Sequence, residues 1–199
     1  MKKAKEYRQA AWENLRGKWG TMALATFVYT LIMAACGILS IIYIGSIAAL
    51  LLTGAFLLGL AAMALKVCKN EEVHTGDLFC GFEQFGSSLA LYLLINIFTI
   101  LWSLLFLIPG IIKAYSYSMS YFVLTDHPEL SANEARKRSM QLMRGKKWKL
   151  FCLQISFIGW GFLILLTLGI LSFWVVPYMQ TATAEFYTDL LAEQGELAS

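Results

Sequence analysis

Charged residues are scarce in this sequence. Asp, Glu, Lys and Arg make up only 15% of its 199 residues, whereas a soluble domain carries about 25%. Hydrophobic residues reach 58%, and the mean hydropathy is +0.62. So few charges do not suffice to give a chain of this size a polar surface. We therefore predict an integral membrane protein built as a single domain over residues 1–199.

The sequence also lacks the residue patterns of common catalytic and metal sites. Its only histidines are His74 and His127, and they form no HxxxH or HExxH motif. The cysteines (Cys36, Cys68, Cys80 and Cys152) show no CxxC spacing. No GxSxG, Walker A or GxGxxG motif occurs. We predict no catalytic residues, no metal site and no cofactor, and hence a protein that is not an enzyme.

Long apolar runs are what the sequence has instead. A membrane-crossing helix needs roughly 20 mostly apolar residues. Four runs meet this requirement: Thr21–Gly45, Ile47–Cys68, Ser87–Pro109 and Lys149–Gly169. Two further runs, Gly110–Thr125 and Ser172–Leu191, are richer in Ser, Thr and Tyr, so we expect them inside the bundle, away from lipid. The prediction is an all-α bundle of about six transmembrane helices, paired as three hairpins.

Basic residues predict the orientation of these spans. Lys and Arg cluster before the first span, after the second, and between the fourth and fifth. The turns expected at Gly45–Ser46, Pro109–Gly110 and Gly169–Ser172 carry no charge. By the positive-inside rule, both termini are cytoplasmic and the outer turns are minimal. Lys113 is the exception, because this topology places it near the outer face.

An internal repeat organises the chain. Glu6-x-Arg8 followed by Arg16-Gly17-Lys18 recurs 128 residues later as Glu134-x-Arg136 followed by Arg144-Gly145-Lys146. Each copy precedes an apolar run, and a third amphipathic segment, Asp77–Phe85, precedes the run at Ser87. We predict three units, at about 1–68, 76–125 and 131–191, each a cytoplasmic interfacial helix followed by a hairpin.

The amphipathic pattern of the two repeated helices is specific. The first has an apolar stripe, and the second has a stripe opposite a polar face that includes Arg136, Lys137 and Gln141. Ser131 and Glu134 form a capping box at the start of the second helix. The stripes are Ala4, Tyr7, Ala11 and Leu15 in the first helix, and Ala132, Ala135, Ser139 and Leu142 in the second.

The segment from Leu101 to Met119 (LWSLLFLIPGIIKAYSYSM) resembles the signature of a bacterial membrane family known as domain of unknown function 975. Further matching segments are Ser131–Ala135, Ser139–Lys146, Ser156–Trp160, Pro177-Tyr178 and Phe186-Tyr187. The resemblance covers essentially the whole chain. It implies a multi-pass protein of the bacterial plasma membrane, mainly in Gram-positive bacteria, and it supplies no activity, cofactor or catalytic residue.

Polar residues of the fourth and sixth predicted spans form a candidate polar seam. Its members are Lys113, Tyr117, Ser120 and Tyr121 from one span, and Gln180, Thr183 and Glu185 from the other. Lys113 and Glu185 are expected about 12 Å apart in depth, too far for direct contact. The seam is either part of a transport path or a set of interhelical hydrogen bonds, and Lys113 is either a cavity charge or a snorkelling lysine.

A second candidate site is the basic cluster before the fifth span: Arg136, Lys137, Arg144, Lys146, Lys147 and Lys149. It is expected to contact anionic lipid, although topology alone also explains such charges. The partners we predict are membrane lipids and a protein of the same membrane, not nucleic acid. The leading hypothesis is a non-enzymatic membrane protein acting through these partners, for example in envelope homeostasis or protection. The alternative is a small transporter or lipid-handling permease.

Overall fold

The computed structural model describes residues 3–39, 44–105 and 107–195, and helices make up 82% of it. The described residues contain no strand, which confirms the all-α class. In chain order the elements are α1 (Ala4–Asn14), α2 (Trp19–Leu39), α3 (Ile44–Cys68), the 3-10 helix η2 (Thr75–Phe82), α4 (Phe85–Leu105), α5 (Leu107–Tyr117), α6 (Ser120–Asp126), α7 (Ala132–Leu142), α8 (Lys147–Ile155), α9 (Ile158–Leu166) and α10 (Ser172–Gln194).

Four stretches of the described residues are long and apolar enough to cross a membrane. They are Trp19–Gly37, Ala49–Cys68, Phe85–Leu104 and Lys147–Leu166, the last of which runs through α8 and α9. These stretches coincide with the four strongest predicted spans. The other two predicted spans are not matched in this way, because α10 is long but more polar and Gly110–Thr125 is divided between α5 and α6.

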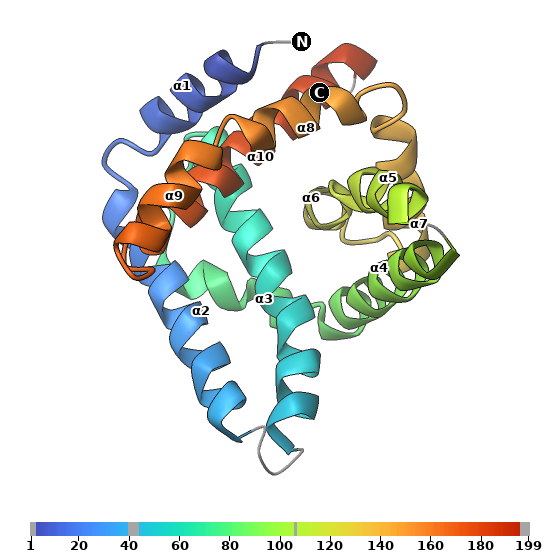
Figure 1. Ribbon diagram of the computed structural model, residues 1–199, viewed down its shortest axis with the longest axis horizontal. Coiled ribbons are helices and arrows are strands. Elements are labelled where there is room, and N and C mark those ends of the chain that lie inside the picture. Colours follow the sequence, from blue (N-terminus) through green and yellow to red (C-terminus); the bar gives the residue numbers. More distant parts are fainter. Residues whose placement is uncertain (1–2, 40–43, 106, 196–199) are drawn as a thin grey trace.

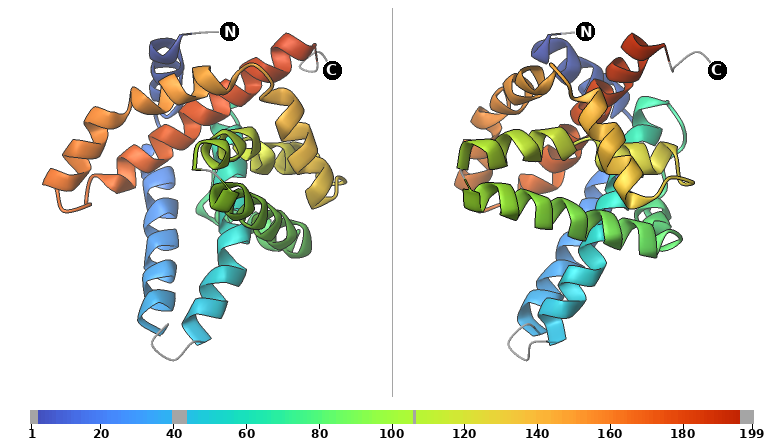
Figure 2. Two further views of the ribbon diagram at one scale, coloured as in Figure 1. Left: turned by 45° about the vertical axis from the view of Figure 1, so that its right-hand side comes forward. Right: turned by 90° about the vertical axis from the view of Figure 1, so that its right-hand side faces the viewer.

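Helix α3 is the centre of the arrangement (Figure 1). It packs against α2, η2, α4, α6 and α10, and 67% of its apolar stretch is buried, compared with 28% or less for the other three. The α2–α3 pair projects away from the remaining helices, whereas the α4–α5 pair runs across its direction (Figure 2). Helix α10 packs mainly against α1, α3 and α2, and much less against α8 and α9.

Two of the three predicted turns are wrong in position. Helix α3 already begins at Ile44, so Gly45–Ser46 is helical. Pro109 and Gly110 lie in the first turn of α5, where proline is tolerated because its missing N–H has no intrahelical partner. The turn before α10 is confirmed, since Gly169 has φ +88° and α10 begins at Ser172.

The repeat predicted from the sequence has the same local structure in both copies. Helices α1 and α7 are each 11 residues long and start 128 residues apart. In each, a glutamate accepts a hydrogen bond from the backbone N–H three residues earlier at 2.8 Å, Glu6 from Lys3 and Glu134 from Ser131. After each helix a left-handed glycine turns the chain into the next helix, Gly17 at φ +80° and Gly145 at φ +75°.

The apolar stripes of α1 and α7 are buried against protein. In α1, Tyr7, Ala11 and Leu15 are at most 1% exposed, and the Tyr7 ring packs edge-on to Phe186 of α10 at 5.4 Å. The stripe of α7 is likewise buried, in a helix that packs against α4, α5 and α6. The prediction that these stripes lie in a membrane interface therefore needs correction, because the same periodicity serves a helix that packs on another helix.

A close backbone contact joins η2 to α3. A Cβ atom at Gly59 of α3 would lie 2.0 Å from the Leu78 carbonyl oxygen, and one at Gly81 of η2 would lie 2.0 Å from that of Ala55. Only glycine permits this separation at both positions. Leu78 is fully buried at the contact, whereas the neighbouring Phe79 is 45% exposed.

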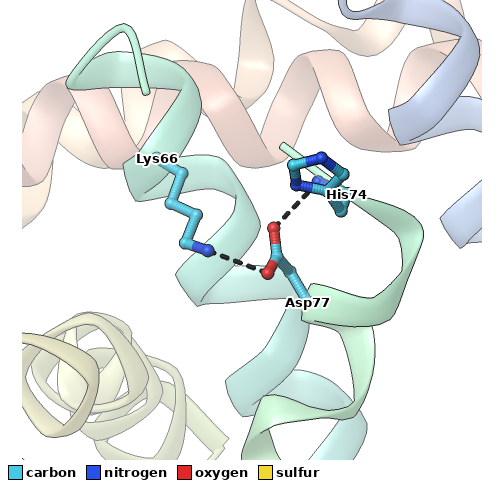
Figure 3. A network of polar contacts seen from close by, with 3 residues as sticks. All are labelled: Lys66, His74 and Asp77. Carbon is cyan, nitrogen blue, oxygen red and sulfur yellow. Dashed lines mark hydrogen bonds and ion pairs between the residues drawn. The ribbon is translucent and has the colours of Figure 1, made fainter. Parts of the chain in front are cut away.

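An ion pair stabilises the same contact (Figure 3). The Lys66 ammonium of α3 donates to Asp77 at 2.8 Å, and the His74 backbone N–H donates to the other carboxylate oxygen at 2.9 Å. Burial of Asp77 opposes its ionisation, but the hydrogen bonds from Lys66 and His74 outweigh this effect and lower the pKa of Asp77. The carboxylate therefore both caps η2 and attaches it to α3.

The glycine contact yields a stability prediction. Gly59→Ala should destabilise the protein by about 1–3 kcal/mol, because the added methyl group forces η2 away from α3. The melting temperature of the detergent-solubilised protein, followed by circular dichroism, should fall by roughly 2–10 °C. Gly20→Ala is the matched control, since a Cβ there meets nothing within 4 Å. An equal melting temperature for both variants would show that the close contact does not limit stability.

Candidate anion-binding cavity

A cavity of about 480 Å³ lies between α5, α7 and the start of α8. Four of its lining side chains are cationic, and its other lining residues are neutral. The cations are Lys113 of α5, Lys137 of α7, Arg144 and Lys147, and the neutral residues are Ser116, Met140, Gln141 and Gly145.

Local structure brings the four cations together. Helix α7 ends at Leu142, and Gly145, in the left-handed region, reverses the chain so that α8 starts at Lys147. Helix α5 packs against both α7 and α8, and it adds Lys113 to the cavity. The Lys113 ammonium lies 4.8 Å from the centre of the Trp102 ring, a distance typical of a cation–π contact.

The surroundings of Lys113 were not predicted from the sequence. Its place near the outer face rested on a full membrane crossing after Pro109-Gly110. In the structure, Lys113 lines one cavity with Lys137, Arg144 and Lys147, which belong to the predicted basic cluster.

The electrostatics of this cavity favour an anion. Four like charges share one cavity, and none of the lining residues is acidic. The cavity also lies at the start of α8, which is the positive end of that helix's dipole. A phosphate or carboxylate group would offset this repulsion and accept hydrogen bonds from the lysines and Arg144.

The remaining members of the predicted basic cluster lie elsewhere. Lys146 forms an ion pair with Glu193 near the end of α10, and Lys149 is exposed and does not line the cavity. Arg136, expected on the polar face of α7, is only 9% exposed. The structure thus divides the six predicted lipid contacts into three that line the cavity and three that do not.

Arg136 is held by aromatic rings. Its guanidinium carbon lies 4.3 Å from the centre of the Phe98 ring and 5.4 Å from that of Tyr117, and it donates to the Asn133 side chain at 2.8 Å. The prediction of an exposed Arg136 is wrong because α7 packs along α4, which carries Phe98. This arginine joins α7 to α4 and α5, and its burial removes it from the lipid-accessible cluster.

The polar seam is only partly assembled. Tyr121, Gln180 and Thr183 line one cavity of about 320 Å³ between α6 and α10, together with Ser118 and Gln154. The other four seam residues lie outside this cavity. Lys113 lines the basic cavity, Tyr117 contacts Arg136, Ser120 is fully buried, and Glu185 accepts a hydrogen bond from Asn14 at 2.5 Å.

Comparison with known protein families matches residues 1–116 and 104–194 to the family described as "Protein of unknown function (DUF975)". The chain belongs to this family. The match confirms the resemblance predicted from the sequence, and the family description assigns no activity. No curated protein and no solved structure matches the chain.

Several residues of the cavity were not predicted from the sequence. These are its neutral lining residues, Ser116, Met140, Gln141 and Gly145. Because they carry no charge, the clustering of basic residues along the chain did not indicate them. Two of them had a signal in the sequence. Gly145 recurs at the repeat offset in the Arg-Gly-Lys motif, and Gln141 shares the predicted polar face of its helix with Lys137. The others are identified only by the packing of α5 against α7.

The burial of Arg136 yields a second prediction. Arg136→Gln should destabilise the protein by about 2 kcal/mol, the value of a desolvated cation–π contact. The control is Arg16→Gln, the same substitution at an exposed position, which should change stability by no more than about 0.5 kcal/mol. Chemical denaturation in detergent measures both. Equal effects of the two substitutions would contradict a structural role for Arg136.

Proposed function

We propose that the protein is a non-enzymatic, multi-pass membrane protein that binds anionic lipid through the basic cavity. The proposal rests on one observation, that four cationic side chains and no acidic one line the same cavity. These are Lys113, Lys137, Arg144 and Lys147. Basic residues near a membrane surface contribute about 1 kcal/mol each to the binding of anionic lipid. A role in envelope homeostasis or protection, exerted through lipid or protein partners, fits this property.

The proposed ligand group is the phosphate of a lipid headgroup. Lysine and arginine donors suit phosphate oxygens, and the start of α8 adds backbone donors. A candidate membrane span adjoins the cavity, because Lys147, which lines the cavity, is the first residue of the stretch Lys147–Leu166. A headgroup held there has its acyl chains beside an apolar helix.

Lipid retention tests the proposal. Lys113→Gln combined with Lys137→Gln should weaken the binding of phosphatidylglycerol by about 30-fold, since about 2 kcal/mol is lost. Native mass spectrometry of the protein with added phosphatidylglycerol or phosphatidylethanolamine measures the binding. The wild-type protein should prefer phosphatidylglycerol.

A charge-matched control separates the cavity from net charge. Lys5→Gln combined with Arg16→Gln removes the same two charges at exposed positions outside the cavity. This pair should leave phosphatidylglycerol binding nearly unchanged. If both double variants lose binding equally, the cavity is not the site and general charge attraction explains the preference.

The topology we propose has six crossings and cytoplasmic termini. Four crossings alone would place Arg136–Lys149 on the opposite side from Lys3–Lys18, against the positive-inside rule. Two further crossings, one through α5 and α6 and one through α10, return both basic regions to one side. The 23-residue length of α10 is sufficient for a crossing.

Cysteine labelling tests this topology. In a variant whose four natural cysteines are replaced by serine, Ser172→Cys at the start of α10 should react with an impermeant maleimide in intact cells. Glu71→Cys, in the connection between α3 and η2, should react only after the cells are broken. Labelling of Ser172→Cys only in broken cells would overturn the six-crossing topology. It would place the turn before α10 on the same side as Trp12 and Trp19, which line one cavity with Leu171 and Trp174.

A transporter is the second candidate function, and the cavity between α6 and α10 favours it. Tyr121, Gln180 and Thr183 give this cavity polar walls from two proposed crossings. If lipid moves through it, Gln180→Leu should reduce the rate at which fluorescent phosphatidylglycerol flips between leaflets of proteoliposomes. Gln194→Leu, at the exposed end of α10, is the control. Equal flip rates for both variants and the wild type would eliminate this candidate.

A further inference from the structure

A second cavity, of about 440 Å³, lies where α1 and α2 meet the turn between α9 and α10. Four of the six tryptophans of the chain line it. The lining residues are Trp12, Trp19, Trp160, Leu171, Trp174, Val175 and Tyr178. Its volume lies within the range of about 300–1,000 Å³ typical of ligand sites.

The walls of this aromatic cavity are held in place by ring contacts. Tyr178 is at the centre of them, with ring centres 5.7 Å from Trp12, 6.2 Å from Trp19 and 6.0 Å from Trp160. Trp12 also packs edge-on to Trp19 at 5.0 Å. Edge-to-face contacts of this kind fix ring orientation, so the cavity is formed before any ligand enters.

The lining offers almost nothing to a polar ligand. None of its side chains is charged, and its only hydroxyl is already engaged, because Tyr178 donates to the Arg8 carbonyl oxygen at 3.0 Å. The four indole N–H groups are donors only and add almost no polar surface to the lining. A sugar, a carboxylate or a primary ammonium would lose its hydrogen bonds to water on entry. Such a loss costs about 1–3 kcal/mol for each neutral group and more for a charge.

A quaternary ammonium is also disfavoured, although aromatic cages bind such cations. No carboxylate lines the cavity, and a positive charge lies behind it. The Arg8 guanidinium is 5.9 Å from the centre of the Phe157 ring, which in turn packs edge-on to Tyr178 at 5.1 Å. The positive end of α10 also adjoins the cavity through Leu171, Trp174 and Val175.

The mouth of the cavity opens onto apolar surface. Trp12 and Trp174 form the rim and are 45% and 46% exposed, whereas Val175 and Tyr178 are buried. Beside the rim, the α9–α10 turn exposes large apolar side chains, including Leu168 at 94% and Ile170 at 64%. A ligand that reaches the mouth across this surface comes from the hydrocarbon of a bilayer.

We propose that the aromatic cavity binds one acyl chain of a membrane phospholipid. The inference does not depend on the basic cavity, which is lined by other residues of α5, α7 and α8. Shape and apolar character recognise the chain, so the headgroup does not decide the affinity. Binding here is saturable, unlike the general contact of spans with lipid.

Quenching of tryptophan fluorescence tests the proposal. In a variant with Trp102→Phe and Trp148→Phe, all tryptophan fluorescence comes from the four cavity residues. Phosphatidylethanolamine with brominated acyl chains is then titrated into the protein in detergent micelles. We expect saturable quenching at a low mole fraction of lipid. Because this headgroup has no net charge, failure here leaves the anionic-lipid proposal standing.

A matched pair of substitutions locates the site. Leu171→Phe, added to this variant, should raise the lipid fraction needed for half-quenching by about tenfold, because the larger side chain occupies the cavity. Ile170→Phe, on the exposed neighbour, should leave it unchanged. If Leu171→Phe does not fold, Trp174→Ala removes part of the rim and should shift the half-point in the same direction.

Two outcomes would overturn the proposal. Quenching that rises in proportion to lipid fraction, and equally in both variants, would mean that lipid only dissolves around the protein. Displacement of the brominated lipid by tetrabutylammonium chloride, but not by excess unbrominated phosphatidylethanolamine, would show that the cavity binds a cation instead.

Discussion

The backbone contact between η2 and α3 determines how the rest of the protein is placed. Gly59 and Gly81 let the two segments approach until a Cβ at either position would clash with a carbonyl oxygen. This contact seats η2 beside the middle of α3, and α4 then starts three residues after η2 ends. Because α5 and α7 pack on α4, the basic cavity depends on a contact between residues that do not line it.

The class of the protein and its strongest spans follow from the sequence because they depend on local composition. Twenty apolar residues with almost no charge form a helix wherever they lie, so the spans at Trp19–Gly37 and Ala49–Cys68 were predictable. The helices against which the amphipathic helices pack were not predictable from the sequence. A stripe such as Tyr7, Ala11 and Leu15 can face lipid or another helix with equal periodicity. Contact with Phe186, more than 170 residues away, depends on tertiary packing.

The candidate site was also predictable in part, because some of its residues lie close together in the sequence. Three of its cations were identified because they lie close together in the sequence: Lys137, Arg144 and Lys147. Lys113 was not grouped with them, because it lies in an earlier segment of the chain and was assigned to the polar seam. In the structure α5 begins at Leu107, packs on α7 and α8, and carries Lys113 to the cluster. Position along the chain does not predict which residues of separate helices meet.

The repeat shows how equivalent residues acquire different roles. Arg8 and Arg136 occupy the same position in α1 and α7, and each guanidinium lies over an aromatic ring, Phe157 for Arg8 and Phe98 for Arg136. Arg8, however, donates at 2.8 Å to the carbonyl oxygen of Ser156, which the break between α8 and α9 leaves without a helical partner. The arginine of the first copy therefore stabilises a helix end beside the aromatic cavity, whereas that of the second joins helices beside the basic cavity. One local motif thus supports two cavities of opposite chemical character.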